Sequence, residues 1–247
     1  MKDNFSPQDF KKIKHNDFPE LEKLILHKLF LLNIEIKNNL KSYNFHKLQK
    51  ELLNFCALDL SSFYFDIRKD ILYCDDLNSN KRKSCVTLLN IVLECLIKWY
   101  APVLSFTTEE ISQLAQKNNK TSIHEENFPE IPDNWKNDDL FKRWEKLLQV
   151  RQQVNIAIEE KRSSKIIGSS LEADVEIALP KSEFDILKEI DAKELFIISN
   201  VTQNILKDKK NEISVTVKKA KGTKCSRCWK IVEKVKEGKC SRCSSIK

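Results

Sequence analysis

The sequence predicts a mainly α-helical protein in which a helical bundle is followed by a small α/β module and a terminal four-cysteine finger. Three observations lead to this fold class. Apolar residues recur at steps of three or four through most of the chain before Gly168, as on one face of a helix. After Gly168 they alternate with polar residues, as in strands. The chain then ends in two Cys-x-x-Cys pairs.

The first part of the bundle is predicted from two apolar series. One predicts a long helix and consists of Leu21, Ile25, Leu29, Leu32, Ile36 and Leu40. The second continues through Phe45, Leu48, Leu52, Phe55, Leu60, Phe63, Ile67 and Ile71. The polar stretch "DDLNSNKRKS" (75–84) is expected to form a loop. Amphipathic helices bury their apolar faces against one another, so these segments predict a bundle.

The bundle is expected to continue after this loop. A third apolar stripe comprises Leu89, Val92, Leu96, Trp99 and Val103. Pro102 should end or kink that helix, and Thr107 with Glu110 has the spacing of a capping box that starts another. Residues 117–138, with Pro129 and Pro132, are interpreted as a long surface connection. A last helix is predicted from Leu140, Trp144, Leu147, Val150, Val154 and Ile158.

The alternating pattern after Gly168 predicts a small α/β module. Strands are expected around Val175, Ile177 and Leu179 and around Ile213, Val215 and Val217. A short helix (181–190) and the apolar stretch "LFII" (195–198) lie between them. The expected division is therefore a bundle at 1–135, a connecting helix at 136–170, the α/β module at 171–220 and the finger at 221–247.

The composition excludes several classes of protein. The chain has 247 residues, of which 41% are hydrophobic, with no apolar run of membrane-spanning length and no basic-then-apolar leader. We therefore expect a cytoplasmic protein without a membrane partner. Only three glycines occur, too few for a phosphate-binding loop. The four histidines show no metal or nucleophile pattern and are interpreted as surface or helix residues.

Positive charge is concentrated at the carboxyl end. Residues 218–247 carry eleven Lys or Arg and two Glu, whereas the rest of the chain has 32 basic and 34 acidic residues. Because lysine and arginine release counterions from phosphates, this region indicates a polyanionic partner. Charge alone leaves RNA, DNA and an acidic protein open.

Two groups of cysteines are expected to differ in role. Cys225, Cys228, Cys240 and Cys243 form two Cys-x-x-Cys turns separated by eleven residues. Such a set offers four thiolates to a tetrahedral Zn²⁺ and leaves no position for a catalytic water, so the site is predicted to be structural. A redox pair is the alternative, disfavoured because two pairs lie close together outside a thioredoxin-like context. Packing is predicted for the four scattered cysteines, which are Cys56, Cys74, Cys85 and Cys95.

The finger also offers candidate contacts to nucleic acid. We expect Arg227, Trp229, Lys230 and Arg242 to be exposed around the zinc site. An aromatic ring can stack on an unpaired base. Trp229 could equally pack on the zinc turn, and the pattern leaves both roles open.

Four blocks of the chain resemble one known family. They are "NFCALDLSSFYFDIRKDILYC" (54–74), "KRKSCVTLLNIVLECLIKWYAPVLSFTTEEI" (81–111), "KRSSKIIGSSLEADV" (161–175) and the terminal "KCSRCWK" with "CSRC". In order and spacing they are similar to the carboxyl-terminal part of bacterial isoleucyl-tRNA synthetase, across about the whole chain. "W-x-AP-x-LSFT-x-EE" resembles several class I synthetases, whereas "DLS-x-FY-x-DI-x-KD" and the terminal cysteine pattern resemble the isoleucine enzyme in particular.

This resemblance implies an anticodon-binding bundle, truncated at its amino end, followed by a junction module and a zinc finger. It implies tRNA(Ile) as the partner, a monomer, and Cys225, Cys228, Cys240 and Cys243 as the zinc ligands. ATP and Mg²⁺ would serve only the full enzyme, whose missing amino-terminal domains would act in cis or in trans. HIGH-type and KMSKS-type motifs and the editing domain are absent, and "KRSSK" (161–165) belongs to a different block. The chain should bind tRNA without activating isoleucine.

Alternatives and weaker candidates complete the expectations. A free-standing zinc-dependent RNA-binding accessory protein acting in trans is a second possibility. A DNA-repair glycosylase is disfavoured, because the chain begins Met1-Lys2 rather than Pro-Glu. Arg82 and Lys83 are weaker tRNA candidates, for which we prefer a solvated loop. The adjacent Glu109 and Glu110 are interpreted as a favourable helix start rather than an acid–base pair.

Overall fold

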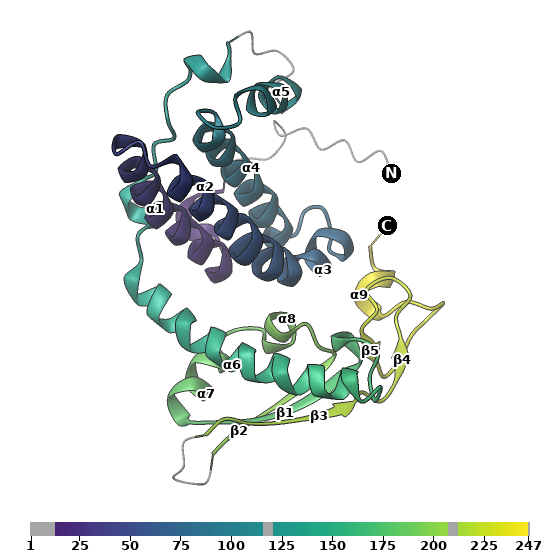
Figure 1. Ribbon diagram of the computed structural model, residues 1–247. Coiled ribbons are helices and arrows are strands. Elements are labelled where there is room, and N and C mark those ends of the chain that lie inside the picture. The colour runs from purple at the N-terminus through teal and green to yellow at the C-terminus, as the bar shows by residue number, and fades with distance from the viewer. Residues whose placement is uncertain (1–12, 116–120, 207–211, 247) are drawn as a thin grey trace. The chain divides into compact units, whose positions relative to one another are not determined.

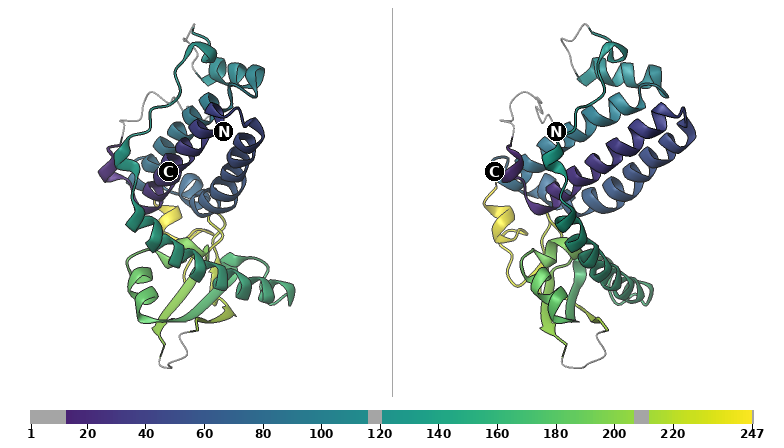
Figure 2. Two further views of the ribbon diagram at one scale, coloured as in Figure 1. Left: turned by 60° about the vertical axis from the view of Figure 1, so that its left-hand side comes forward. Right: turned by 90° about the vertical axis from the view of Figure 1, so that its left-hand side faces the viewer.

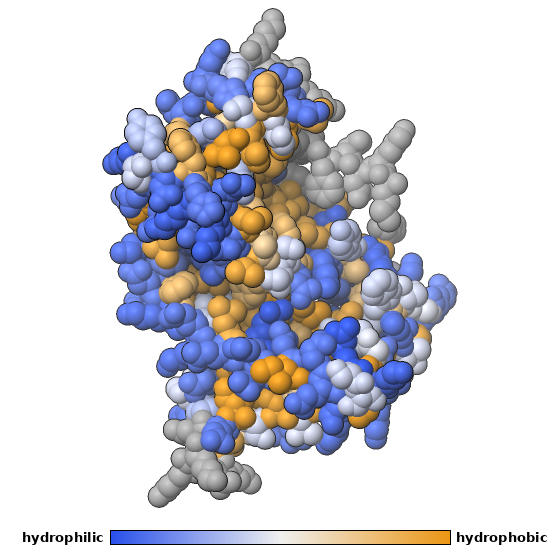
Figure 3. Space-filling model, viewed as in Figure 1, coloured by the Kyte–Doolittle hydropathy of each residue, from blue (hydrophilic) through white to orange (hydrophobic). Residues whose placement is uncertain are grey.

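The structure is a computed structural model that describes residues 13–115, 121–206 and 212–246. The chain divides into two compact units. The bundle unit extends to Arg68 and resumes over Leu77–Asn137, and the finger unit comprises Lys69–Asp76 and Asp138–Lys247. Within the described residues, every helix is either too short or too polar to span a membrane. Figure 3 shows a face on which hydrophilic residues predominate, with hydrophobic residues between them.

The bundle unit is built from helices that pack beside one another (Figure 1). Its elements are the 3-10 helix His15–Asp17, α1 (Glu20–Lys41), α2 (Phe45–Asn54), a π-helical segment (Phe55–Phe65), the first turn of α3 (Asp66–Cys74), α4 (Asn80–Tyr100) and α5 (Ser105–Ala115). Helix α1 contacts α2, the π-helical segment and α4. The predicted stripe on α1 is confirmed for Leu21, Ile25, Leu29, Leu32 and Ile36, which are buried, whereas Leu40 at its end is only partly buried.

A π-helical segment lies in the middle of the second apolar series. The series steps by five from Phe55 to Leu60, one residue more than an α-helical turn allows. Hydrogen bonds from i to i+5 admit that extra residue. Phe55, Leu60, Phe63 and Tyr64 are consequently buried on one side. The helical prediction is confirmed, and the change of helix type is an addition to it.

Helix α4 ends at Tyr100, as Pro102 predicts. Its buried face differs from the predicted stripe, because Leu89 and Leu96 are only partly buried. The face that is buried consists of Cys85, Leu88, Val92, Cys95 and Trp99. The packing role predicted for Cys85 and Cys95 is confirmed, and burial raises the pKa of Cys95 to about 12.

The capping-box prediction for the next helix is wrong. Helix α5 begins at Ser105, so Thr107 lies inside it. The hydroxyl of Thr108 donates to the carbonyl of Leu104 at 3.0 Å. The predicted connection after α5 contains the 3-10 helices Ile123–Glu125 and Asp133–Trp135, and its residues 117–120 lie outside the described residues.

A buried ion pair joins α1 to α3 inside the bundle unit. Arg68 donates from Nε and Nη2 to the two carboxylate oxygens of Glu22, each at 2.7 Å. The hydroxyl of Tyr64 donates to the same carboxylate at 3.0 Å. Burial, followed by the negative charge of Glu22, raises the pKa of Tyr64. These paired charges share an interior that is otherwise largely apolar.

The finger unit contains a two-layer α/β module. The described elements of this unit after the bundle are α6 (Asp138–Ser163), the 3-10 helix Ser170–Glu172, β1 (Ala173–Leu179), α7 (Lys181–Lys188), α8 (Ala192–Phe196), β2 (Asn200–Ile205), β3 (Ser214–Lys219), β4 (Thr223–Lys224), β5 (Ile231–Val232) and α9 (Ser241–Ser244). The last three belong to the finger. The main sheet has the order β2-β1-β3, in which β1 is parallel to β2 and antiparallel to β3. Helix α6 runs along the sheet and contacts β3, α7 and α8 (Figures 1 and 2).

The sequence predicts most of this module. All six predicted apolar residues of α6 are buried, and burial alternates along β1 as expected of a strand with one covered face. The strand β3 and the helix α7 also lie where they are predicted. Strand β2 is unforeseen, because its sequence "NVTQNI" is mostly polar. The division of the chain into four domains stays a prediction.

Candidate metal centre and nucleic-acid interface

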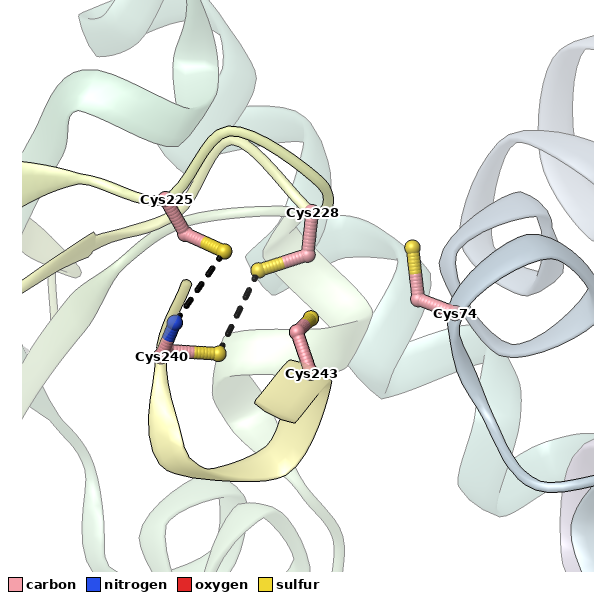
Figure 4. Packing of buried hydrophobic residues seen from close by; sticks show 5 residues of the cluster. All are labelled: Cys74, Cys225, Cys228, Cys240 and Cys243. Atoms are coloured by element: carbon pink, nitrogen blue, oxygen red, sulfur yellow. Dashed lines mark hydrogen bonds between the residues drawn. The ribbon is translucent and has the colours of Figure 1, made fainter. Parts of the chain in front are cut away.

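Four cysteine side chains converge at the end of the finger unit. Cys225 follows β4, Cys228 lies in the next turn, Cys240 precedes α9 and Cys243 lies within it. All four are buried, and their sulfur atoms lie within 4.8 Å of one another. Figure 4 shows the four side chains pointing toward one another. The two Cys-x-x-Cys pairs therefore form one cluster, as the sequence predicts.

The spacing of the sulfurs fits a tetrahedral zinc ion. With a Zn–S bond of about 2.3 Å, the sulfurs at two corners of a tetrahedron lie about 3.8 Å apart. The Sγ atoms of Cys228 and Cys240 are 3.8 Å apart, far beyond the length of a disulfide. Four protein ligands complete the coordination, so this donor set suits a structural ion rather than a catalytic one.

Backbone hydrogen bonds shape the turn around the first pair. The N–H of Trp229 donates to the carbonyl of Cys225, and the N–H of Cys240 donates to the Cys225 sulfur at 3.3 Å. Burial opposes ionisation of Cys225, but N–H donors including that of Cys240 lower its pKa to about 6. Burial and neighbouring thiols raise the pKa of Cys228 and of Cys243. A divalent cation at the centre would offset the mutual repulsion of the thiolates.

The turn before the cysteines has a strict requirement for glycine. Gly222 has φ +134°, and a Cβ there would lie 2.4 Å from the carbonyl oxygen of Val232. This close approach pairs β4 with β5. The hydroxyl of Ser199 accepts a hydrogen bond from the N–H of Ile231 at 2.7 Å and so attaches β5 to the α/β module.

A fifth cysteine lies beside the four. Cys74, at the end of α3, is buried next to them, and its thiol donates to the carbonyl of Arg227 at 3.7 Å. In Figure 4 it stands outside the group formed by the four sulfurs. The packing role predicted for Cys74 is confirmed, and its partner is the finger. Cys56, also predicted to pack, is only half-buried.

Asp70 and Asp75 form an acidic clamp that binds Arg242 and Lys230, two of the predicted RNA contacts. Arg242 donates from Nη1 and Nη2 to the carboxylate of Asp70 at 2.8 and 2.7 Å. Its Nη1 also donates to Asp75 at 3.3 Å, and Lys230 lies 3.3 Å from Asp70. Burial disfavours the charged form of Asp70, but the hydrogen bond from Arg242 leads the contacts that lower its pKa overall.

The structure corrects the expectation that the four candidate RNA contacts of the finger, Arg227, Trp229, Lys230 and Arg242, are all exposed. Lys230 and Arg242 are partly buried, because their charges meet Asp70. Arg227 is also partly buried and donates to the carbonyls of Tyr73 at 3.3 Å and Ile246 at 3.5 Å. Trp229 is 60% exposed with φ +63°. Its ring is therefore accessible, which argues against the alternative that it is packed away on the zinc turn.

The weaker candidates Arg82 and Lys83 do not lie in a loop. The hydroxyl of Ser79 accepts from the N–H of Arg82 at 3.2 Å, and this N-cap starts α4 at Asn80. Arg82 is only 9% exposed, and Lys83 is half-buried. The predicted solvated loop therefore ends before both residues, and Arg82 is not an exposed cation.

Two further polar residues have structural partners. Glu109 accepts from the hydroxyl of Ser122 at 2.8 Å and from the N–H of Ile123 at 3.0 Å, and these bonds lower its pKa. It connects α5 to the next segment instead of starting a helix. His27 is buried, and its Nδ1 accepts from the N–H of Asn137 at 2.9 Å.

The sequence reasoning missed the acidic partners of the clamp. Asp70 lies within α3 and Asp75 directly follows that helix, and four uncharged residues separate the two. Nothing in their spacing indicates that their partner is Arg242, more than 160 residues further along the chain.

Known proteins similar to this chain are tRNA ligases. Residues 22–177 match the family described as the anticodon-binding domain of tRNA ligase. The chain is 50% identical over 231 residues to an isoleucine–tRNA ligase of Pelagibacter ubique, covering 94% of the chain and 25% of the relative. It is 39% identical over 229 residues to that of Agrobacterium fabrum, covering 89% and 24%. The chain spans about a quarter of the length of these relatives, and the family match ends before the four-cysteine cluster that begins at Cys225.

Proposed function

The chain belongs to the family of tRNA ligase anticodon-binding domains, and on that premise we propose that its own activity is the recognition of the anticodon arm of tRNA(Ile). The match over residues 22–177 carries this proposal. Relatives named isoleucine–tRNA ligase, one of them 50% identical, support isoleucine as the specificity. ATP-dependent aminoacylation with Mg²⁺ is proposed for a full enzyme, and this chain alone is proposed to be catalytically inactive.

The finger is proposed to contribute to tRNA binding through its shape and charge. Cys225, Cys228, Cys240 and Cys243 would hold one Zn²⁺, which supplies the stability that so small a core lacks. We propose Trp229 and Arg227 as direct contacts to RNA. Lys230 and Arg242 are proposed to hold the finger in position, since the carboxylate of Asp70 already engages both.

Electrostatic capture is the proposed first step of binding. Exposed lysines surround the finger, namely Lys219, Lys221, Lys234, Lys236 and Lys239. Each lysine that meets a phosphate releases counterions, so affinity falls steeply with salt. Unpaired bases would then be read by stacking and hydrogen bonding, as in most sequence-specific RNA recognition. We further propose that the protein acts as a monomer in the cytoplasm, with catalytic domains supplied in cis or in trans.

A filter-binding assay at several salt concentrations tests this function. The chain is mixed with tRNA(Ile) and, as a control, with an unrelated tRNA of the same length. Tighter binding of tRNA(Ile) at every salt concentration is expected. Equal weak binding of both, with the same salt dependence, would show only a polycation and overturn the proposal.

A further inference from the structure

The turn between α1 and α2 places a tyrosine where helices usually have glycine. The N–H of Tyr43 donates to the carbonyl of Leu40 at 3.1 Å, and that of Asn44 donates to Asn39 at 2.8 Å. These two bonds form the Schellman arrangement that commonly ends a helix. The residue at its centre adopts a left-handed conformation, and Tyr43 has φ +52°. Glycine adopts this conformation without the steric cost that tyrosine incurs.

Burial does not offset this cost. Tyr43 is 80% exposed, so its ring removes little apolar surface from water. The ring meets Phe45 edge to face, with centroids 6.4 Å apart and an angle of 64° between the planes. Phe45 is itself 40% exposed. Two aromatic rings thus lie together at the surface, and the ring of Tyr43 contributes little to the stability of the fold.

The surroundings of the two rings are positively charged. Between residues 37 and 50 there are four lysines and no aspartate or glutamate. These lysines, all exposed, are Lys37, Lys41, Lys47 and Lys50. Lys47 lies 3.5 Å from Glu35, and both side chains are about half exposed, so this pair is weak. The concentration of charge is separate from the basic carboxyl end and lies in the bundle unit.

We propose that this turn is a stacking platform for an unpaired RNA base. Tyr43 presents the face of its ring to the base, Phe45 supports the ring from its edge, and Lys41 meets a neighbouring phosphate. Aromatic rings among lysines suit single-stranded nucleic acid, because bases stack on the rings while phosphates meet the charges. A protein partner fits less well, since the residues adjoining the rings are polar or basic: Lys41, Ser42, Asn44, His46 and Lys47.

The inference rests on the proposed function and makes it specific. It assigns a base contact to the bundle unit, whereas the contacts proposed above lie in the finger unit. It also predicts an unusual outcome for Tyr43→Gly. Glycine suits the left-handed position better than tyrosine, so the substitution should leave the bundle as stable as before or more stable. It should nevertheless weaken RNA binding, because the stacking surface is lost.

The test uses the whole chain and a tRNA(Ile) anticodon stem-loop carrying 2-aminopurine at one loop position at a time. Stacking on Tyr43 should quench the fluorescence of at least one position, and Tyr43→Gly should remove that quenching. The affinity should fall by about 5-fold or more, the range of one base–aromatic stack. Tyr43→Phe keeps the ring and should keep the affinity.

Phe106→Ala is the matched control. Phe106 is an aromatic residue of the same unit, 94% exposed and followed closely by Glu109 and Glu110 rather than by lysines. Its loss should leave RNA binding unchanged. If the original chain binds tRNA(Ile) specifically and Tyr43→Gly binds equally well, the stacking platform is wrong and the proposed function stands. If the original chain shows no specific binding, both the stacking platform and the proposed function are wrong.

Discussion

The bundle unit and the terminal finger are stabilised in different ways. The bundle buries continuous apolar faces of several helices and adds the buried ion pair of Glu22 with Arg68. The finger has a core of buried cysteines, with Val232 packed against it. Its four cysteines are positioned to hold a metal ion, and Asp70 binds Arg242 and Lys230 beside them. Burial of apolar surface thus suffices for the larger unit, whereas a segment of under 30 residues needs additional bonds.

Removal of the metal should have the largest effect among these changes. It should distinguish the finger from the bundle, because the finger should unfold while the bundle changes little. A chelator, or Cys225→Ser, should unfold residues 221–246, because zinc bound to such a site contributes on the order of 10 kcal/mol. The helical signal of the bundle should change little. Hydrogen exchange measured separately for α1 and for the finger checks this, together with one zinc per chain by metal analysis. Retention of full protection in a metal-free finger would contradict the zinc site.

Glu22→Gln should destabilise the bundle unit instead. Arg68 would lose the carboxylate that balances its charge, and breaking a buried ion pair costs about 3–5 kcal/mol. Urea unfolding of the bundle measures the effect. Glu35→Gln is the matched control, since it removes an exposed pair with Lys47 and should cost under about 1 kcal/mol. Similar effects of the two substitutions would show that burial of the Glu22 carboxylate adds nothing.

Asp70→Asn should loosen the finger without reaching the bundle's core. It removes the carboxylate shared by Arg242 and Lys230. Because these groups are partly exposed to solvent, the expected loss is about 1–2 kcal/mol. Faster hydrogen exchange in residues 225–243, with unchanged exchange in α1, is the expected result. Glu233→Gln, which changes an exposed acidic residue of the finger outside the clamp, serves for comparison, and equal effects of both would contradict the clamp.

Trp229→Gly should have the smallest effect on stability. Trp229 is largely exposed and has a left-handed backbone conformation that glycine adopts readily, so the free energy of unfolding should change by under about 0.5 kcal/mol. Binding of tRNA(Ile) should weaken about 5-fold or more through the lost stacking surface. Affinity and thermal unfolding are measured on the same samples. A large loss of stability would instead assign Trp229 a packing role.

Local patterns predicted the elements whose burial follows a simple period. The stripes of α1 and α6 are buried as expected, because one face of a helix meets one neighbouring surface. The pattern was misleading for α4, where Leu89 and Leu96 are as apolar as the residues that are buried. Strand β2 carries a weak pattern, and it forms because the edge of β1 supplies backbone partners.

The candidate sites also contain features that local sequence patterns predicted and features that they did not. The spacing of the four cysteines was sufficient to predict their cluster, since each Cys-x-x-Cys turn directs both of its sulfurs to one point. The roles of the basic residues were not predictable in this way. Arg242 and Arg82 are both arginines in charged, polar stretches, yet one meets Asp70 and the other is buried in the first turn of α4.

The sequence by itself determined most helices of the bundle, the clustering of the four terminal cysteines and the resemblance to a tRNA ligase, because each can be read from local patterns of residues. Tertiary structure decided which cations are held by carboxylates and which aromatic rings remain exposed. Charges and rings act through neighbours that are distant in sequence, as Asp70 is from Arg242. The left-handed conformations of Tyr43 and Trp229 likewise become visible only in the folded backbone.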